Sequence, residues 1–274
     1  IVPMTRGRER SRPTSEILEE VTALTANGTR EVTLLGQTVN SYGKNLLEGR
    51  VPFSQLLWQL ADVEALQRIR YTSPYPRDFT ADLIETIRDC PKVMEHCHLP
   101  LQSGNEQVLK AMRRLYTPDS FKEIVSNLRE AVPGIGLTTD IIVGFPGESE
   151  EQFEDTLKVV EEVRFDGAYM FIYSPRPGTP ASELEQIPVS VKKARLNRLV
   201  ELQNRITCEI NESYIGRTLE VLVEGASPKN KGMLQGYSRE FKMVHFEGQT
   251  ARAGRLAQVK ITGAHLWGLS GELV

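Results

Sequence analysis

The chain has 274 residues, of which 40% are hydrophobic and 25% charged, and its formal net charge is −3. This composition is ordinary for a globular protein of one large or two smaller domains, and the length suffices to bury a core without disulfides. Three cysteines are too few for a secreted disulfide scaffold, and no apolar run approaches the roughly 20 residues of a membrane span. We therefore expect a cytoplasmic protein with no membrane partner and, since the chain starts at Ile1 rather than Met, a piece of a longer protein.

Charge is unevenly distributed along the chain. Residues 211–274 hold eight Lys and Arg against six Asp and Glu, a net charge of +2, whereas residues 1–210 have a net charge of −5. A basic tail on an acidic body permits contact with nucleic acid, although basic clusters of this size usually belong to an ordinary solvated surface.

Strands and helices alternate from residue 14 to about residue 174. The first helix begins at Thr14 or Ser15 and ends at Gly28, and a later one opens with the capping-box pair Ser149 and Gln152. Apolar residues at helical spacing predict the other helices over residues 53–66, over residues 80–89 and from residue 117 onward. Short apolar runs predict strands over residues 31–36, 69–73, 96–101, 136–143 and 168–173.

This alternation predicts an α/β fold with a parallel sheet and helices outside it, either an open doubly wound sheet or a (β/α) barrel. Neither a dinucleotide fingerprint nor a triphosphate-binding loop follows any strand. Polar clusters follow several strands instead, among them residues 36–40, 102–104 and 144–148. In a barrel these clusters converge on the C-terminal face, where barrel enzymes hold their active sites, so a barrel is favoured.

The last quarter of the chain has a different pattern. A long amphipathic helix over about residues 190–214 ends near Gly216 and precedes five short strands. Five strands within about 60 residues predict a small closed β-barrel, either of the kind that binds oligonucleotides or a generic capping module. We therefore divide the chain into residues 1–210, which include most of the linking helix, and residues 211–274.

Two strands contain polar side chains suited to chemistry. His96 and His98 share one face of their strand while Cys97 faces away, and no fourth ligand has a metal-like spacing, so core or pocket histidines are favoured over a metal site. Asp140 lies inside an apolar strand, where a carboxylate must be paired or hydrogen-bonded, which favours a pocket position over a surface one.

Five motifs, in order along the chain, resemble those of the radical S-adenosylmethionine methylthiotransferases. They are residues 1–13 (IVPMTRGRERSRP), 34–42 (LLGQTVNSY), 98–104 (HLPLQSG) with Met112-Arg113-Arg114, 139–148 (TDIIVGFPGE) and 173–180 (YSPRPGTP). Residues 72–76 (TSPYP) and 100–104 (PLQSG) are most similar to the MiaB branch of that family. The tail resembles the family's TRAM domain, a small RNA-binding β-barrel.

The resemblance implies a fold and an activity. The fold is a partial (β/α) radical-SAM-type barrel, here lacking its first strand, followed by the OB-like TRAM barrel. The activity is the addition of a methylthio group to carbon 2 of N6-isopentenyladenosine beside the tRNA anticodon, by a 5′-deoxyadenosyl radical that a [4Fe-4S] cluster generates from S-adenosylmethionine. A second [4Fe-4S] cluster in an N-terminal domain delivers the sulfur. The implied partners are the tRNA anticodon stem-loop and an electron donor such as flavodoxin or ferredoxin.

Three alternatives stay open. A sister branch of the family acts on threonylcarbamoyladenosine in tRNA. The chain also fits a module that only binds RNA, or an unrelated barrel enzyme with an accessory β domain; the latter predicts no salt-dependent affinity for tRNA.

The resemblance also assigns site residues. For S-adenosylmethionine they follow three strands and are implied to hold, in turn, the methionine amine, the ribose or the methionine carboxylate, and the adenine: Gly36 and Gln37; Gln102 and Ser103; and Asp140, Ile142 and Gly144. Arg10 and Arg12 suit a carboxylate or a phosphate, because the guanidinium fork pairs with both. The candidate contacts to the RNA backbone are Arg217, Lys229, Lys231, Arg239 and Lys242.

One departure from the family pattern affects the chemistry. The three cysteines in C-x-x-x-C-x-x-C spacing that hold the radical-generating cluster are absent, and the pattern would put the last of them immediately before Ile1. Cys90, Cys97 and Cys208 do not replace them. We therefore predict that residues 1–274 alone hold no cluster, contain no catalytic residue and have no turnover, whereas the full-length protein holds two clusters.

Overall fold

The computed structural model describes residues 7, 9–46, 49–228, 232–248 and 252–274. Its first part is built on five parallel strands in two sheets. β1 (Glu31–Leu34) pairs with β2 (Arg68–Tyr71), and β3 (His96–His98), β4 (Gly136–Val143) and β5 (Gly167–Ile172) form the second sheet in that order. A parallel bridge between Ile69 and Val93 joins the two sheets. The strands therefore follow one another around a partial barrel in chain order.

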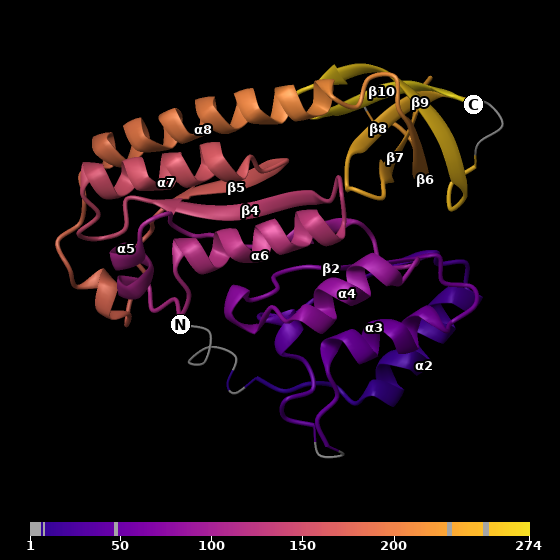
Figure 1. Cartoon of the computed structure of the whole chain (residues 1–274), viewed down its shortest axis with the longest axis horizontal. Helices are drawn as coiled ribbons and strands as arrows, with labels where there is room; N and C mark the ends of the chain where they lie inside the picture. The colour runs from indigo at the N-terminus through magenta and orange to yellow at the C-terminus, as the bar shows by residue number, and fades with distance from the viewer. Residues whose placement is uncertain (1–6, 8, 47–48, 229–231, 249–251) are drawn as a thin grey trace.

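Helices cover the outside of these strands (Figure 1). They are α2 (Thr14–Ala26), α3 (Phe53–Ala61), α4 (Ala81–Asp89), α5 (Glu106–Ala111), α6 (Pro118–Ala131), α7 (Glu150–Val163) and α8 (Val189–Glu212), with short 3₁₀ turns at Val39–Ser41, Pro76–Asp78 and Pro180–Ser182. No helix in the described ranges combines the length and apolar character needed to cross a membrane.

The period of two along β4 decides which side chains face the helices and which face inward. Leu137, Ile141 and Val143 are buried in the helix-covered core, whereas Asp140 and Ile142 are only partly buried. Because side chains alternate along a strand, Asp140 and Ile142 point into the interior of the partial barrel. We call this interior the lumen.

β5 completes the wall of the lumen on one side. Its register pairs Asp140 with Tyr169 and Ile142 with Phe171. Tyr169 is 57% exposed and Phe171 51% exposed, so the lumen has aromatic side chains that the described chain leaves uncovered.

Most predicted elements are confirmed, with shifts at their ends. The predicted helix over residues 53–66 ends at Ala61, because the chain turns through Asp62 and Val63 before β2. The ladder of the predicted strand over residues 96–101 ends at His98, and a further bridge forms between Gln102 and Ile141. The short helix α5, capped by Asn105, was not predicted.

The tail forms a closed barrel of five strands in the order β10-β8-β7-β6-β9. The strands are β6 (Thr218–Ala226), β7 (Leu234–Ser238), β8 (Met243–Glu247), β9 (Leu256–His265) and β10 (Gly268–Leu273), which confirms all five predicted strands. Their inward side chains form a second core that includes Val221, Phe246 and Val259. The expected small β-barrel is therefore present, while the domain boundary at residue 210 stays a prediction.

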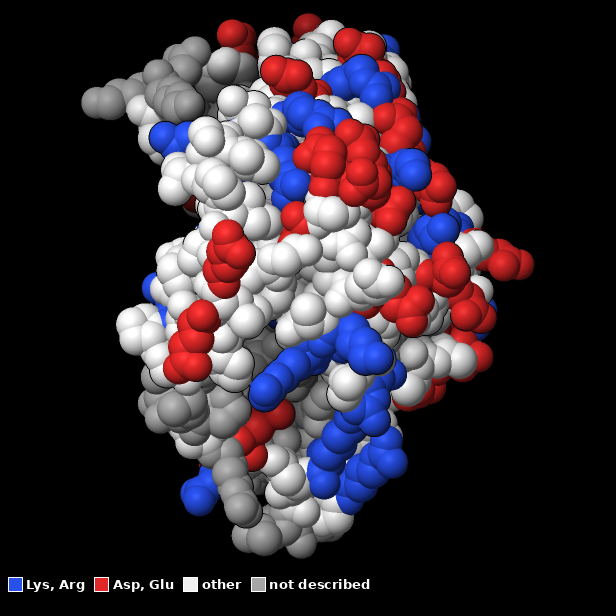
Figure 2. All heavy atoms as spheres, turned by 90° about the vertical axis from the view of Figure 1, so that its left-hand side faces the viewer, with Lys and Arg blue, Asp and Glu red and all other residues white. Residues whose placement is uncertain are grey.

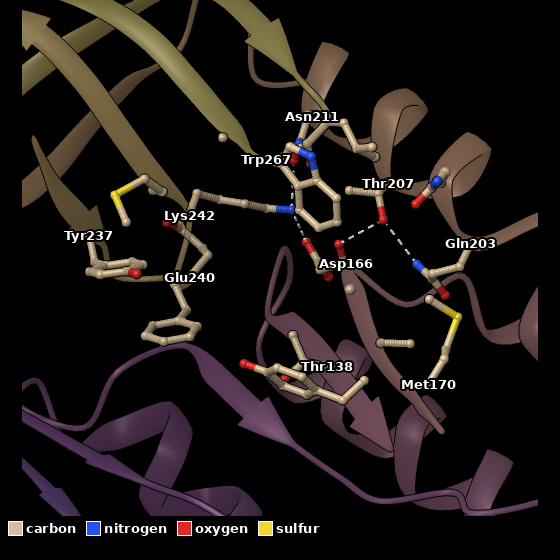
Figure 3. A pocket seen from close by; sticks show the side chains of 18 residues that line it. Thr138, Asp166, Met170, Gln203, Thr207, Asn211, Tyr237, Glu240, Lys242 and Trp267 are labelled. Atoms are coloured by element: carbon tan, nitrogen blue, oxygen red, sulfur yellow. Dashed lines mark hydrogen bonds and ion pairs between the residues drawn. The ribbon is translucent and has the colours of Figure 1, made fainter. Parts of the chain in front are cut away.

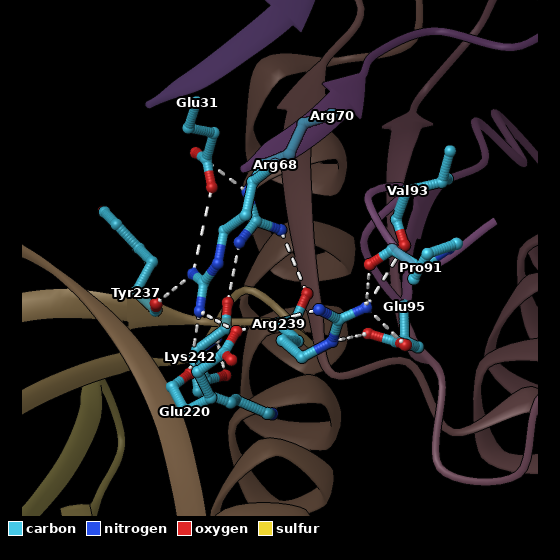
Figure 4. A network of polar contacts seen from close by, with 11 residues as sticks. Glu31, Arg68, Arg70, Pro91, Val93, Glu95, Glu220, Tyr237, Arg239 and Lys242 are labelled. Carbon is cyan, nitrogen blue, oxygen red and sulfur yellow. Dashed lines mark hydrogen bonds and ion pairs between the residues drawn. The ribbon is translucent and has the colours of Figure 1, made fainter. Parts of the chain in front are cut away.

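The tail barrel lies against the N-terminal ends of β2, β3 and β4 (Figures 1 and 4). Arg68, with a side chain 1% exposed, donates to the carbonyls of Tyr237 and Glu220 and pairs with the Glu220 carboxylate at 2.9 Å. Arg239 pairs in turn with Glu95, just before β3, at 2.6 Å. A network of ionic and carbonyl contacts thus holds the two barrels together.

Candidate functional site

A cavity of about 150 Å³ opens at the C-terminal ends of the parallel strands. We call it the C-terminal cavity. Gln37, which follows β1, Gln102, which follows β3, and Asp140 in β4 all line it. The other residues that line it are Thr38, Ser73, Pro74, Tyr75, Pro76, Pro100, Arg114 and Tyr116.

Backbone geometry fixes Gln102 beside Asp140. Gln102 has a φ of +67°, in the left-handed region that a residue other than glycine seldom adopts. Its N–H donates to the Asp140 carbonyl at 2.8 Å, and its own carbonyl accepts from Ile142 N–H at 2.9 Å. The amide side chain, in a residue only 5% exposed, is therefore held in place at the cavity wall.

The remaining predicted cofactor residues lie near the C-terminal cavity without lining it. Gly36 is exposed and precedes Gln37, and Ile142 faces the lumen beside Phe171. Ser103 is fully buried, with its Oγ 3.4 Å from Thr156 Oγ1 on α7. Gly144 has a φ of +74° and lies against the Lys192 side chain. The structure thus brings together three of the seven.

Gly144 is held by a buried ion pair rather than by turn geometry alone. Its N–H donates to Glu148 Oε2 at 2.7 Å, and Arg195 Nη1 donates to the same oxygen at 2.9 Å. Burial raises the pKa of Glu148, and the Gly144 N–H and Arg195 oppose that rise. The turn after β4 is therefore anchored to α8 through Arg195.

A second cavity of about 240 Å³ lies deeper in the lumen than the first, toward the N-terminal ends of the strands. We call it the lumen cavity. His96 and His98, predicted as core or pocket histidines, both line it, and each has a ring nitrogen 3.0 Å from Thr138 Oγ1. His98 Nε2 also lies 3.4 Å from Asp140 Oδ2. Burial, with the positive charge of Arg70, holds the pKa of His96 well below its ordinary value, so this ring is neutral at physiological pH.

The two cavities meet at Ser73 and Asp140, which line both. A ligand at the C-terminal ends of the strands would therefore contact one held deeper in the lumen. Asp140, predicted as a pocket residue, stands at that junction.

Arg114 is a site residue that sequence reasoning missed. It lines the C-terminal cavity and forms no ion pair with any residue in the described part of the chain. Its motif, Met112-Arg113-Arg114, was visible in the sequence, but the left-handed Arg113 (φ +58°) that turns the chain back after α5 was not. An unpaired guanidinium in a polar cavity is suited to a carboxylate or a phosphate.

Metal-binding groups are absent from the residues that the structure describes: no set of three or more His, Cys, Asp or Glu side chains is placed to hold an ion. Burial raises the pKa of the Cys97 thiol to about 12, which disfavours the thiolate that a cluster requires. Cys90 is buried as well, and Cys208 is partly buried on α8. The described residues therefore do not fit an iron–sulfur cluster.

The candidate RNA contacts have different surroundings. Lys229 and Lys231 lie outside the described residues. Arg217 is exposed, with its guanidinium 4.5 Å from the centre of the Tyr214 ring. Lys242, only 6% exposed, pairs with Asp166 at 2.6 Å, and Arg239 is paired with Glu95 as described above. A role in RNA binding stays a prediction for all five.

A third cavity, of about 290 Å³, lies between the tail barrel, β5 and α8 (Figure 3). Trp267, in the turn between β9 and β10, lines it and is 83% exposed. Such a large exposed aromatic side chain is a surface on which a nucleic-acid base can stack. Sequence reasoning did not select Trp267, because exposure of a turn residue depends on how the two barrels pack.

The face seen in Figure 2 lies at the left of Figure 1, where α7 and α8 begin. In its upper part acidic and basic side chains alternate. Ion pairs join α7 and α8, among them those of Arg198 with Glu150 and Glu154. In its lower part several Lys and Arg side chains lie close together. A polyanion is therefore repelled less by the lower part of this face than by the upper part, where acidic side chains are interspersed. Of the N-terminal arginines, Arg12 is paired with Glu20 at 2.6 Å.

Comparison with known families defines the class of this protein. The model of the radical SAM superfamily matches residues 1–160, and that of the TRAM domain matches residues 212–274. The chain therefore belongs to the radical SAM superfamily and carries a TRAM domain after its partial barrel.

Curated relatives give a more particular similarity. The chain is 50% identical, over 100% of its length, to proteins named tRNA-2-methylthio-N(6)-dimethylallyladenosine synthase from Acetivibrio thermocellus, Alkaliphilus oremlandii and Clostridioides difficile. It covers 57 to 58% of those proteins, so it spans little more than half their length. Among solved structures, coproporphyrinogen III oxidase from Escherichia coli, described as a radical SAM enzyme, is similar in fold, with a TM-score of 0.53 and 14% identity over 83% of this chain and 60% of that one.

Proposed function

We propose that the full-length protein is a tRNA methylthiotransferase that adds a methylthio group to carbon 2 of N6-dimethylallyladenosine, the isopentenyl nucleoside, beside the anticodon. The strongest support is the 50% identity, over the whole chain, to synthases named for this nucleoside. Those names favour dimethylallyladenosine over threonylcarbamoyladenosine as the substrate. The anticodon stem-loop, an electron donor of the flavodoxin or ferredoxin kind and a cytoplasmic location belong to the same proposal.

S-adenosylmethionine would be held in the C-terminal cavity. Its amine, carboxylate and ribose hydroxyls need both donors and acceptors, and the amides of Gln37 and Gln102, the Asp140 carboxylate and the Arg114 guanidinium supply both. The donor set therefore fits this cofactor. When bound and reduced, it supplies the radical that removes a hydrogen atom from the base.

The chain's own residues position the groups that react. Thr138 and Asp140 fix the ring of His98 from its two nitrogens, which holds the Asp140 carboxylate where the two cavities meet. The lumen cavity would hold the base on the side of the cofactor that faces the N-terminal ends of the strands, with part of the surface of the base removed from water. Since the described residues do not fit a cluster, we propose that other parts of the full-length protein hold both clusters.

The test is a methylthiolation assay. The reconstituted full-length protein, with a reduced electron donor and S-adenosylmethionine, is given tRNA that carries N6-dimethylallyladenosine, threonylcarbamoyladenosine or unmodified adenosine. The expected result is a methylthio product, identified by mass spectrometry of the nucleosides, from the first tRNA only. A product from threonylcarbamoyladenosine instead would overturn the assignment, and iron retained by residues 1–274 alone would contradict the cluster prediction.

Contact between RNA and the tail is tested through Trp267. The chain has two tryptophans, Trp267 and the 42% exposed Trp58 on α3. We expect an anticodon stem-loop to quench the fluorescence of the Trp58→Phe variant and not that of Trp267→Phe, because a stacked base quenches indole emission. Trp267→Ala should weaken binding about 5- to 100-fold, the range for one stacked base. Quenching that survives in Trp267→Phe and disappears in Trp58→Phe would place the RNA elsewhere.

A further inference from the structure

The turn between β7 and β8 carries a strained aromatic residue. Phe241 has a φ of +68°, which is unfavourable for any residue with a side chain and is usually left to glycine or asparagine. The turn is closed by Ser238, whose N–H donates to the Lys242 carbonyl and whose carbonyl accepts from Phe241 N–H. A strained residue persists only where its surroundings hold it. A phenylalanine at this position therefore indicates that its ring has a structural or functional role.

The Phe241 ring leaves its own domain and enters the lumen of the other. It stacks on Tyr237, with 4.7 Å between ring centres and 12° between planes, and its centre lies 4.7 Å from that of His96. The Arg70 guanidinium lies 5.0 Å from the same ring. The turn fits tightly, because a Cβ on Gly136, the first residue of β4, would come within 2.3 Å of the Glu240 carbonyl oxygen.

Phe241 lies at the end of the lumen cavity opposite the cofactor, where its side chain lines both the lumen cavity and the third cavity. Ser73 and Asp140, shared with the C-terminal cavity, mark one end of the lumen cavity. His96 and Arg70 lie nearer the strand starts, at the same end as Phe241. We call this end, formed by Phe241, His96 and Arg70, the lumen floor. A substrate whose reacting atom faces the cofactor would direct its far part toward this floor.

The chemistry of the lumen floor favours an apolar group. Arg70 is already paired with Glu31 at 3.1 Å and donates to the carbonyls of Ser238 and Arg239. His96 is bonded to Thr138. Because Arg70 is already paired with a carboxylate and both of its terminal nitrogens donate to carbonyls, the floor offers mainly ring surface, which suits a hydrocarbon and gives little to a carboxylate.

We propose that Phe241, from the TRAM domain, is a specificity-determining residue: its ring ends the lumen and sets the length of the apolar substituent that the enzyme accepts on the N6 atom of adenosine. This rests on the proposed function, in which that substituent is the branched dimethylallyl group. It assigns to the TRAM domain a part in choosing the modified base, besides any contact with the RNA backbone.

The test compares affinities rather than turnover. Three RNA stem-loops, identical except for one loop adenosine that is unmodified, N6-dimethylallyl or the bulkier N6-benzyl, are titrated onto the full-length protein. We expect the parent to bind the dimethylallyl form at least about 10-fold more tightly than the unmodified form, given the hydrocarbon it would bury. Phe241→Gly relieves the left-handed strain, so the variant folds; it should reduce this preference to below about 3-fold and admit the benzyl form.

A second variant acts in the opposite direction. Phe241→Trp fills the floor and should weaken binding of the dimethylallyl form by about 10-fold or more while leaving the unmodified form unaffected. Arg164→Gly is the matched control. It relieves the backbone strain at another left-handed residue (φ +52°), which ends α7 and is far in the sequence from the three residues of the lumen floor. This control variant should have the same relative affinities for the three stem-loops as the parent protein.

The outcomes separate the two proposals. If the parent protein prefers the dimethylallyl stem-loop and both Phe241 variants show the same relative affinities as the parent, the role of Phe241 is overturned and the proposed function still stands. A parent that binds all three stem-loops equally, with no methylthio product, would remove the proposed function itself.

Discussion

His96 makes the stability of the fold depend on pH through a single side chain. It is 8% exposed, and burial holds its pKa well below the roughly 6.5 of an unfolded histidine. The unfolded chain therefore binds a proton that the folded chain does not. The stabilisation is fully present above about pH 6.5 and is lost as the pH falls below that value, by up to ~1.4 kcal/mol per pH unit.

This prediction is checked by urea unfolding at about pH 7.5 and about pH 5.5. His96→Gln, which keeps a donor for Thr138, should show a smaller loss of unfolding free energy between the two pH values than the parent. His265→Gln, at an exposed position in the tail, is the control and should keep the parent's loss. An unchanged loss in His96→Gln would show that other groups cause the acid sensitivity.

Among the elements, α7 depends on its first turn to hold the Gly144–Glu148 loop in place. Ser149 Oγ accepts from Gln152 N–H, and the Gln152 side chain accepts from Ser149 N–H. Ser149→Ala should lower the free energy of unfolding by ~1 kcal/mol, because it leaves the Gln152 N–H without its acceptor. Ser126→Ala, at an exposed position inside α6, is the control and should change stability by less than about 0.5 kcal/mol. Equal losses in both variants would mean that the cap contributes nothing specific.

That capping box was predictable because its residues are three apart in the sequence, and so was β4, whose ladder matches the predicted residues 136–143. The interpretation of Asp140 as a pocket residue needed only its apolar neighbours. The left-handed Gln102 and Phe241 were not predictable, since Gln102 is bonded to Asp140 and Ile142 and the Phe241 ring packs on His96, all remote in the sequence. Local patterns thus predicted most elements and the pocket position of Asp140, whereas tertiary contacts decided which other side chains meet it; the role of the candidate cofactor residues stays a prediction.

At the scale of the whole molecule, the two barrels are joined by charged side chains that sequence patterns did not identify. Arg70 lies in the strand predicted over residues 69–73 and Arg68 immediately precedes that range, yet both side chains reach the tail about 170 residues away. Three of their partners are main-chain carbonyls at or next to the turn that carries Phe241, those of Tyr237, Ser238 and Arg239. The position of the lumen floor therefore depends on this network.

Arg68→Met is the sharpest test of that dependence. Methionine retains much of the volume but leaves the carboxylate of Glu220 and the carbonyls of Tyr237 and Glu220 without their donor, which costs ~3–5 kcal/mol when a buried ion pair is broken. We expect the parent to unfold in a single calorimetric transition and Arg68→Met to unfold in two, as the barrels separate. Arg88→Met, which removes an exposed pair with Asp89, should keep the single transition. If Arg68→Met also unfolds in one transition at the parent's midpoint, Arg68 does not couple the domains, and the Phe241 turn must be held by Arg70, by the Arg239–Glu95 pair and by ring contacts.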